Sequence, residues 1–226
     1  MLPREPIATA EIPGGGTLTL LRHGRDHVIM LGREELMGTR MRFSEEQLAE
    51  LTLDRVTAPA PRILIGGYGM GFTLRAALAR LPADGSVVVG ELVPEIVEWA
   101  RGPLSDLTGD SLSDARLTLE IGDVAALIDD AGEGFSRHYD AILLDVDNGP
   151  DGLVRPDNDA LYSRRGLERA RRALSPGGVL AIWSAAPDPA FAQRFAKAGF
   201  AVEELTVRAR PNNKGPRHTL WFGRPS

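Results

Sequence analysis

The sequence predicts an α/β fold in which a mostly parallel sheet carries helices on both faces. From residue 62 onward, short apolar runs alternate with helical stretches, and this alternation is typical of parallel βαβ units. The last two apolar runs have no helix between them, which indicates a terminal β-hairpin. Five strand–helix units and two final strands together predict a seven-stranded sheet.

The composition is that of an ordinary globular chain. Of 226 residues, 43% are hydrophobic and 25% are charged, so long disorder is not expected. The lack of cysteine excludes disulfides, thiolate metal sites and a cysteine nucleophile. The net charge of −5 argues against general nucleic-acid binding. The four histidines show no metal-ligand spacing, so we predict no metal site.

The sequence indicates neither an export signal nor a membrane helix. The opening stretch, MLPREPIATAEIPGGG, lacks the basic-then-apolar layout of a signal peptide. No apolar run approaches the ~20 residues that a membrane helix needs. We therefore expect a cytoplasmic protein that makes no contact with a membrane.

The N-terminal quarter is predicted to form a small unit of its own. Residues 1–13 are rich in proline and alanine and are expected to be a flexible arm. Residues 14–56 are expected to hold a β-hairpin followed by a helix. Ser44 and Gln47 have the spacing of a capping box, which places Ser44 at the N-cap of a helix ending near Leu53.

Residues 57–226 are predicted to form the main domain. Its expected strands are 62–65, 86–90, 115–121, 139–144 and 179–183, followed by the hairpin strands 201–207 and 218–222. Its expected helices are 72–80, 94–101, 124–130, 161–174 and 189–198, and a Pro-Gly-Gly sequence closes the fourth of them. The one long irregular stretch is 145–159, and loops of that length are usually functional or disordered.

A glycine-rich loop follows the first strand of this domain and opens a helix. It reads Gly66-Gly67-Tyr68-Gly69-Met70-Gly71. Glycines let the backbone turn sharply and approach a ligand closely, and the helix N-terminus adds exposed N–H groups. The spacing Gly-x-Gly-x-Gly at 67, 69 and 71 fits the dinucleotide fingerprint Gly-x-Gly-x-x-Gly poorly. It therefore favours S-adenosylmethionine over a nicotinamide dinucleotide.

Acidic residues end the next three strands. Glu91 lies 20 residues after Gly71 and is suited to accept hydrogen bonds from ribose hydroxyls. Asp123, after Gly122, is suited to an adenine amino group, or simply to capping the helix that follows. Asp145 ends the fourth strand. Because ligands bind at the carboxyl ends of parallel strands, these acids are expected to share one crevice with the glycine loop. Leu92 and Val124, beside two of these acids, are assigned to the same cofactor site.

The order of these motifs resembles the spermidine synthase family. The resemblance rests on the glycine loop, GELVP at 90–94, Gly-Asp at 122–123, YDAILLD at 139–145, LYS at 161–163 and LSPGG at 174–178. It implies a Rossmann-like, seven-stranded sheet of the class I methyltransferase type with a small N-terminal β-domain. The family transfers an aminopropyl group from decarboxylated S-adenosylmethionine to putrescine and is often dimeric. Ser44-Glu45 occupies the place of the family's Asp-Glu pair.

The departures from the family pattern point to a different donor. The family's acid that binds the amine of the aminopropyl chain falls on Gly69 here, and its second acid after the fourth strand falls on Asn148. The family's Tyr-His pair is also missing from residues 47–50, which read QLAE. Intact S-adenosylmethionine carries a carboxylate that an acid at position 69 would repel, so loss of the acid removes the selection against it.

We therefore predict methyl transfer from S-adenosylmethionine to a small polar acceptor. The resemblance makes Asp145 the base or orienting acid, with Asp147 as a second catalytic or substrate-aligning group. Asn148, Tyr162 and Trp183 are the further candidates for substrate contact, although packing alone would also explain Tyr162 and Trp183. The partners expected are a small-molecule acceptor and, by resemblance, a second copy of the chain in a homodimer.

Two alternatives remain open at this stage. The first is true aminopropyl transfer from decarboxylated S-adenosylmethionine, with Asp147 supplying the charge missing at position 69. The second is a degenerate member that binds a nucleoside without turnover.

Overall fold

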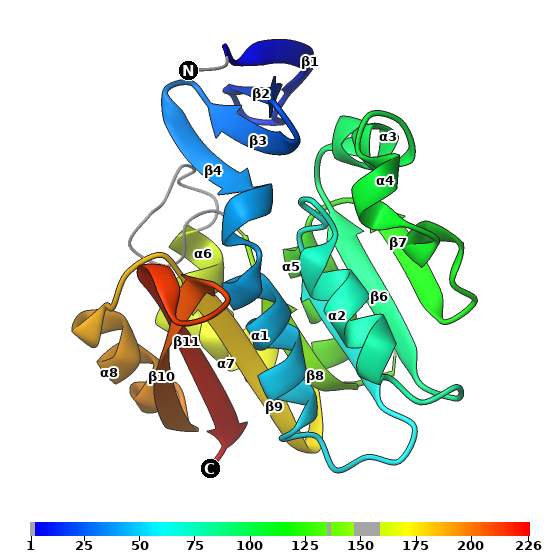
Figure 1. Cartoon of the computed structure of the whole chain (residues 1–226). Helices are drawn as coiled ribbons and strands as arrows, with labels where there is room; N and C mark the ends of the chain where they lie inside the picture. Colours follow the sequence, from blue (N-terminus) through cyan, green and yellow to red (C-terminus); the bar gives the residue numbers. More distant parts are fainter. Residues whose placement is uncertain (1–2, 135–136, 147–158) are drawn as a thin grey trace.

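The chain folds into two sheets that lie one above the other (Figure 1). The computed structural model describes residues 3–134, 137–146 and 159–226. A four-stranded antiparallel sheet has the order β1-β2-β3-β4, and a seven-stranded sheet has the order β10-β11-β9-β8-β5-β6-β7. In the described part of the chain, no helix is both long enough and apolar enough to cross a membrane.

The N-terminal sheet is larger than the sequence predicts. Its strands are β1 (Glu5–Glu11), β2 (Thr17–His23), β3 (Asp26–Leu31) and β4 (Glu34–Gly38). The predicted hairpin corresponds to β2 and β3. The prediction of a flexible arm over 1–13 is wrong for 5–11, because this segment pairs with β2 along its length. Alanine and proline give it little strand propensity of its own, so the pairing partner decides its conformation.

Helix α1 (Phe43–Leu53) links the two sheets, and its start differs from the predicted capping box. Arg42 is the N-cap and makes no side-chain capping bond. Ser44 lies inside the first turn and is fully buried. Its hydroxyl is used in contacts with the large sheet, which a local capping pattern cannot reveal.

The seven-stranded sheet has the predicted class of fold. Strands β5 to β9 run parallel to one another, and β11 runs antiparallel to both β9 and β10. The bounds are β5 (Arg62–Gly66), β6 (Ser86–Glu91), β7 (Leu117–Ile121), β8 (Tyr139–Leu144), β9 (Leu174–Ser184), β10 (Phe200–Arg210) and β11 (Lys214–Pro225). The α/β prediction of five parallel strands and a terminal hairpin is confirmed.

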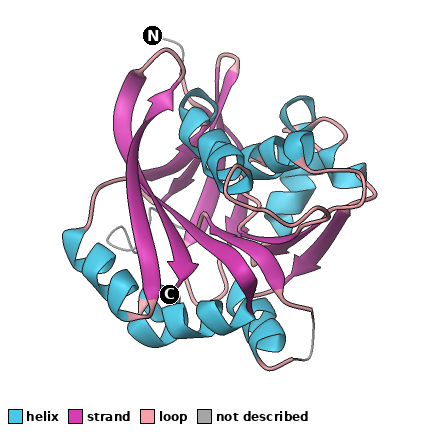
Figure 2. Ribbon diagram, turned by 90° about the horizontal axis from the view of Figure 1, so that it is seen from below, coloured by secondary structure: helices cyan, strands magenta, loops and turns pink. Residues whose placement is uncertain are grey.

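The helices cover both faces of this sheet (Figure 2). The longer ones are α2 (Phe72–Arg80), α3 (Pro94–Arg101), α5 (Val124–Gly132), α7 (Arg164–Ala173) and α8 (Pro189–Lys197). The short ones are η1 (Thr39–Met41), α4 (Ser105–Thr108), η2 (Ser111–Ser113) and α6 (Asp159–Tyr162). The single helix predicted over 161–174 is divided at Ser163, whose hydroxyl accepts a hydrogen bond from Gly166 N and caps α7.

Alternate residues of each central strand feed two separate cores. In β5, Ile63 and Ile65 join the core beneath α1, α2, α3 and the N-terminal sheet, whereas Leu64 joins the core beneath α5, α7 and α8. In β8, Ala141 and Leu143 face the first core and Ile142 and Leu144 face the second. This period of two is the geometry of a strand buried on both sides. It decides which side chains of the central strands lie on the face that the N-terminal sheet shares.

Candidate functional site

The glycine loop brings the ends of β5 and β8 into close contact. Gly67, Gly69 and Gly71 have φ angles of +85°, +55° and +76°, in the left-handed region that favours glycine. Gly67 N donates a hydrogen bond to Gly90 O at 2.9 Å. A Cβ atom at Gly67 would lie 2.9 Å from the carbonyl oxygen of Asp145. The loop therefore needs glycine at 67 both for its backbone angle and for the nearness of Asp145.

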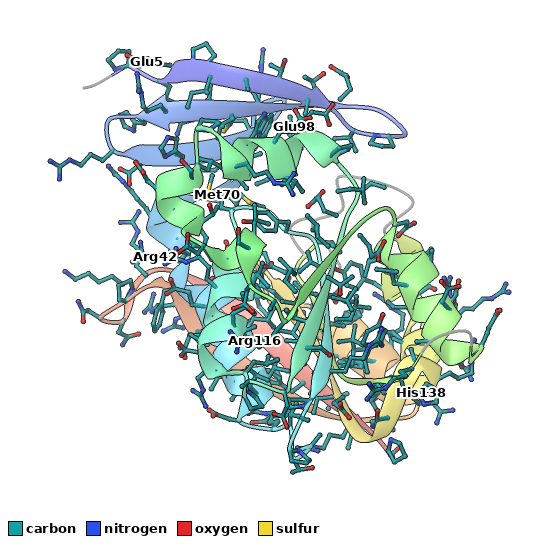
Figure 3. The ribbon with its side chains drawn as sticks, turned by 90° about the vertical axis from the view of Figure 1, so that its right-hand side faces the viewer. Glu5, Arg42, Met70, Glu98, Arg116 and His138 are labelled. Carbon is teal, nitrogen blue, oxygen red and sulfur yellow. The ribbon has the colours of Figure 1, made fainter. Side chains whose placement is uncertain are left out.

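A cavity of about 130 Å³ opens at the carboxyl ends of β5, β6, β7 and β8. Eight of the predicted cofactor residues line it: Gly67, Gly69, Glu91, Leu92, Gly122, Asp123, Val124 and Asp145. The opposite wall comes from the N-terminal segment and consists of Ile12, Leu18, Ile29, Leu36 and Met37. In Figure 3 the N-terminal sheet lies over α3, which carries Glu98, and Met70 of the glycine loop lies below that helix.

The remaining predicted residues of the glycine loop do not line this cavity. Gly66 is packed against Leu144 and Val124, which a Cβ atom would approach to 3.2 Å. Tyr68 is buried, and its hydroxyl would lie 2.8 Å from a Cβ atom at Gly71. These residues pack against the rest of the protein and thereby support the conformation of the loop.

Glu91 lies at the end of β6 and is almost fully buried. Its two carboxylate oxygens accept hydrogen bonds from Tyr68 N and Val93 N, each at 2.8 Å. Burial raises the pKa of Glu91, and the backbone N–H groups around it oppose that rise. Glu91 thus ties the glycine loop to the start of α3 and presents a carboxylate to the cavity.

Asp123 caps a helix, as one of its two predicted roles requires, and it also lies at the cavity wall. Its side chain accepts a hydrogen bond from Ala125 N at 2.8 Å and caps α5. It also lines the cavity. A helix cap at a cavity wall leaves the second carboxylate oxygen available to a ligand.

Asp145 forms a polar cluster with residues of α1 and α2. The Thr73 hydroxyl donates to Asp145 Oδ2 at 2.8 Å and lies 3.5 Å from the carbonyl oxygen of Glu45. Burial raises the pKa of Asp145 to about 6, against the lowering effect of the Thr73 hydrogen bond. Burial and the nearby charges of Asp145 and Glu46 raise the pKa of Glu45 well above its usual value.

The cluster suits proton transfer or the binding of a cation. Burial and the neighbouring Asp145 make Glu45 hold its proton to a higher pH than an exposed glutamate does. Among the described residues, no basic side chain forms a hydrogen bond or an ion pair with Asp145 or Glu45. An ammonium group would supply the positive charge that this pair lacks.

Tyr162 and Trp183, both predicted as substrate contacts, lie outside the cavity lining. Tyr162 is buried with its ring edge-on to Phe191, and its hydroxyl donates to Val146 O at 3.2 Å. The hydroxyl therefore anchors the backbone directly after Asp145. The structure favours the packing alternative for Tyr162, with a polar anchor added.

Trp183 belongs to a buried polar network with Ser44 and His218. The indole N–H donates to Ser44 Oγ at 3.1 Å, and Ser44 Oγ lies 2.8 Å from His218 Nδ1. Burial lowers the pKa of His218 to about 4, so the ring is neutral at pH 7. Ser44 Oγ accepts from the indole N–H, and the tautomer of His218 decides which partner donates in the Ser44–His218 hydrogen bond. The network fixes the first turn of α1, which also carries Glu45.

Several features of the site lie beyond the predictions or the described residues. Thr73, Leu18, Ile29 and Leu36 were missed, because a threonine in a helix and apolar residues in strands carry no distinctive local signal. Glu45 was noted only through the family resemblance. Asp147 and Asn148 lie outside the described residues, so their roles remain predictions.

The chain is similar in sequence to two groups of transferases. Putrescine N-methyltransferase 3 of Nicotiana tabacum is 36% identical over 135 residues, which are 60% of this chain and 32% of that protein. The polyamine aminopropyltransferase of Mycobacterium tuberculosis strain H37Rv is 32% identical over 137 residues, 61% of this chain and 25% of that protein. The aligned segments thus span about a third or less of these relatives. No profile of a known protein family matches the chain.

The fold is that of spermidine synthase. The spermidine synthase of Thermotoga maritima matches with a TM-score of 0.73 at 17% identity, over 97% of this chain and 72% of that structure. A spermidine synthase in complex with the transition state analogue AdoDATO matches with the same score and coverage. The four-stranded N-terminal sheet is thus included in the likeness.

Proposed function

Because this chain is a spermidine-synthase-like protein in both sequence and fold, we propose that it transfers a methyl group from S-adenosylmethionine to a small polar amine. Its relatives carry the names of two reactions, methyl transfer and aminopropyl transfer. The two reactions use donors that differ in one carboxylate. The choice between them therefore depends on which groups line the donor cavity.

The observation that carries the proposal is the glycine at position 69. The family pattern has an acid here that binds the amine of the decarboxylated donor. In this chain Gly69 lines the cavity with a φ of +55°, and the Met37 side chain lies against it in place of a carboxylate. A site without that acid does not repel the carboxylate of the intact donor.

The residues around the cavity fit such a donor. Gly67 needs a bare backbone beside Asp145, as expected where a ligand approaches a loop closely. In the proposal, Glu91 accepts hydrogen bonds from the ribose hydroxyls and Asp123 from the adenine amino group, while Leu92 and Val124 contact the base. Glu91 lines the cavity with its carboxylate held by the backbone N–H groups of Tyr68 and Val93, so the carboxylate is fixed in place before a ligand arrives.

The proposed chemistry needs a base more than any other catalytic group. When bound, S-adenosylmethionine supplies a methyl carbon that an amine lone pair attacks while sulfur departs with the bonding electrons as a neutral thioether. Asp145 receives the proton that the amine loses. Its pKa of about 6 makes it a better base than an ordinary aspartate at neutral pH. Thr73 holds the carboxylate in position by its hydrogen bond to Oδ2.

Calorimetric titration with each donor tests the proposal directly. We expect intact S-adenosylmethionine to bind at least about ten-fold more tightly than the decarboxylated form, which is about 1.4 kcal/mol. The reverse preference would favour aminopropyl transfer, and assays with putrescine as the acceptor would then detect it. Binding of neither donor would favour a member without catalytic activity.

The role of Asp145 is tested by substitution with asparagine. We expect Asp145→Asn to lower kcat for methylation of an amine acceptor such as putrescine by about 100-fold or more, the usual range for loss of a general base. The Kd for the donor should change little, because the amide keeps the size and the acceptor oxygen of the carboxylate. Asp130→Asn, on the exposed face of α5, is the matched control. An Asp145→Asn enzyme with full activity would exclude this residue as the base.

A further inference from the structure

The side chain of Met37 fills the space beside Gly69. Met37 belongs to β4 of the N-terminal sheet and lines the same cavity as Gly69. Its Sδ and Cε atoms both lie 2.9 Å from the position that a Cβ atom at Gly69 would take. Real Cβ atoms essentially never come this close to another heavy atom. A side chain at position 69 and the present conformer of Met37 therefore exclude each other.

The backbone at Gly69 is the first obstacle to an acid. Its φ of +55° is in the left-handed region, which strains any side chain, although aspartate and asparagine enter it more readily than other non-glycine residues. The second obstacle is the overlap with Met37. Both contacting atoms are at the free end of that flexible side chain, so Met37 must turn away before an acid fits. The space beside position 69 is thus occupied from a different sheet, about thirty residues earlier in the chain.

From this contact we propose that Met37 is a donor-specificity residue that acts as a pair with Gly69. The inference rests on the proposed function and extends it to the N-terminal sheet. Met37 fills with an uncharged thioether the volume that an acid at 69 needs. It thereby keeps the donor site without a negative charge at this point. An unbranched methionine suits this role because it adapts its shape to the space available.

The contact between Met37 and Gly69 also leads to a prediction about how the donor preference could be reversed. Replacing Gly69 alone adds a charge but sets it against Met37, so Met37 must turn away before the new carboxylate can take its place beside a donor amine. Shortening Met37 opens the space. Only the combination of both changes should give a site that prefers the decarboxylated donor.

A double-mutant cycle tests this inference with Gly69→Asp, Met37→Ala and the double variant. Thermal unfolding without ligand is the first readout, and the ratio of the Kd values for the two donors is the second. We expect Gly69→Asp to lower the melting temperature and to weaken binding of both donors. Adding Met37→Ala should restore much of the melting temperature and shift the Kd ratio at least ten-fold toward the decarboxylated donor, relative to Met37→Ala alone.

Leu36→Ala in combination with Gly69→Asp is the matched control. Leu36 lines the same cavity from the same strand but is not among the atoms within 4 Å of a Cβ at 69. Adding Leu36→Ala to Gly69→Asp should neither restore the melting temperature nor shift the Kd ratio toward the decarboxylated donor. The inference is overturned if Gly69→Asp is fully tolerated beside Met37, or if the double variant keeps the donor ratio of Met37→Ala. If the unchanged protein binds neither donor, the proposed function fails instead, and the stability cycle still reports the contact.

Discussion

At the scale of single residues, the buried position of Asp145 lowers the stability of the folded state when its carboxyl group is ionised. It is surrounded by protein on most sides and lies near Glu45, yet its partner in a hydrogen bond is the neutral Thr73 hydroxyl. A carboxylate in such surroundings is harder to ionise than in the unfolded chain. The same property that would make it a useful base therefore makes it a source of pH-dependent instability.

The stability of the protein should fall as the pH rises through the range from about 4 to about 6. The pKa of Asp145 is raised from 3.8 to about 6, so in this range the folded state holds a proton that the unfolded state has lost. Stability is then highest below pH 4 for this group and is reduced above pH 6, by at most ~3 kcal/mol. Glu45, whose pKa is also raised, acts in the same direction and extends the fall to higher pH.

Urea denaturation at several pH values measures this effect. Asp145→Asn should flatten the decrease between pH 4 and 6 and should be more stable than the unchanged protein at pH 7. Asp130→Asn should keep the slope. Equal slopes for the two variants would show that Asp145 ionises normally in the folded state.

Gly67 offers a second prediction at the residue scale. Gly67→Ala should destabilise the protein by more than the ~1–2 kcal/mol that a left-handed backbone alone costs, because its Cβ would meet the Asp145 carbonyl oxygen at 2.9 Å. Gly177→Ala is the control, since Gly177 has a similar φ of +79° and nothing lies within 4 Å of its Cβ. Chemical denaturation compares the two, and equal losses would mean that the loop shifts without cost.

At the scale of elements, the position of α1 depends on one buried hydroxyl. Ser44→Ala leaves the Trp183 indole N–H and His218 Nδ1 without their partner in the interior. We expect a loss of about 1–3 kcal/mol in the free energy of unfolding, the usual cost of unsatisfied buried polar groups. The exposed Ser113→Ala should change stability by less than ~0.5 kcal/mol. If Ser44→Ala lowered the free energy of unfolding as little as Ser113→Ala does, the network would contribute little to stability.

Elements with a strong local signal were predictable from the sequence, and those held by distant partners were not. Strands β5, β6 and β8 are continuous apolar runs because both of their faces are buried, and their predicted bounds are nearly those observed. By contrast, β1 has a weak local pattern and depends on β2, and the predicted cap at Ser44 was overridden by Trp183 and His218.

The same distinction holds for the site. Glycines and acids at strand ends were predictable because the parallel sheet brings such ends together, and eight of these residues line one cavity. The apolar wall was not predictable in detail, because nothing in Leu18, Ile29 or Met37 indicates which distant loop the N-terminal sheet will cover. Tyr162 follows the long loop and Trp183 lies near the end of β9, but the direction of a side chain depends on tertiary packing.

At the scale of the whole molecule, the cavity is shared between two sheets that have no strand in common. A donor that fills it would contact both. We expect S-adenosylmethionine at 100 times its Kd to stabilise the folded state by about 2.7 kcal/mol. Hydrogen exchange should show increased protection in β2, β3 and β4 as well as in the glycine loop.

The amides of α8, which lies away from the cavity, serve as the internal reference for that experiment. Protection confined to the glycine loop and the ends of β6 and β7 would contradict a binding site walled by both sheets.

The placement of β11 has a consequence for how the protein is made. Although β11 follows β10 in the chain, it lies between β10 and β9 and, among the described residues, provides the only strand pairing of β10 with the sheet. During synthesis on the ribosome, β10 emerges before the strand that holds it, and the open edge of β9 exposes unpaired backbone groups until β11 arrives. Such an edge is a template for pairing with other chains. Nascent chains stalled between residues 184 and 214 are therefore expected to be the species that most need a chaperone.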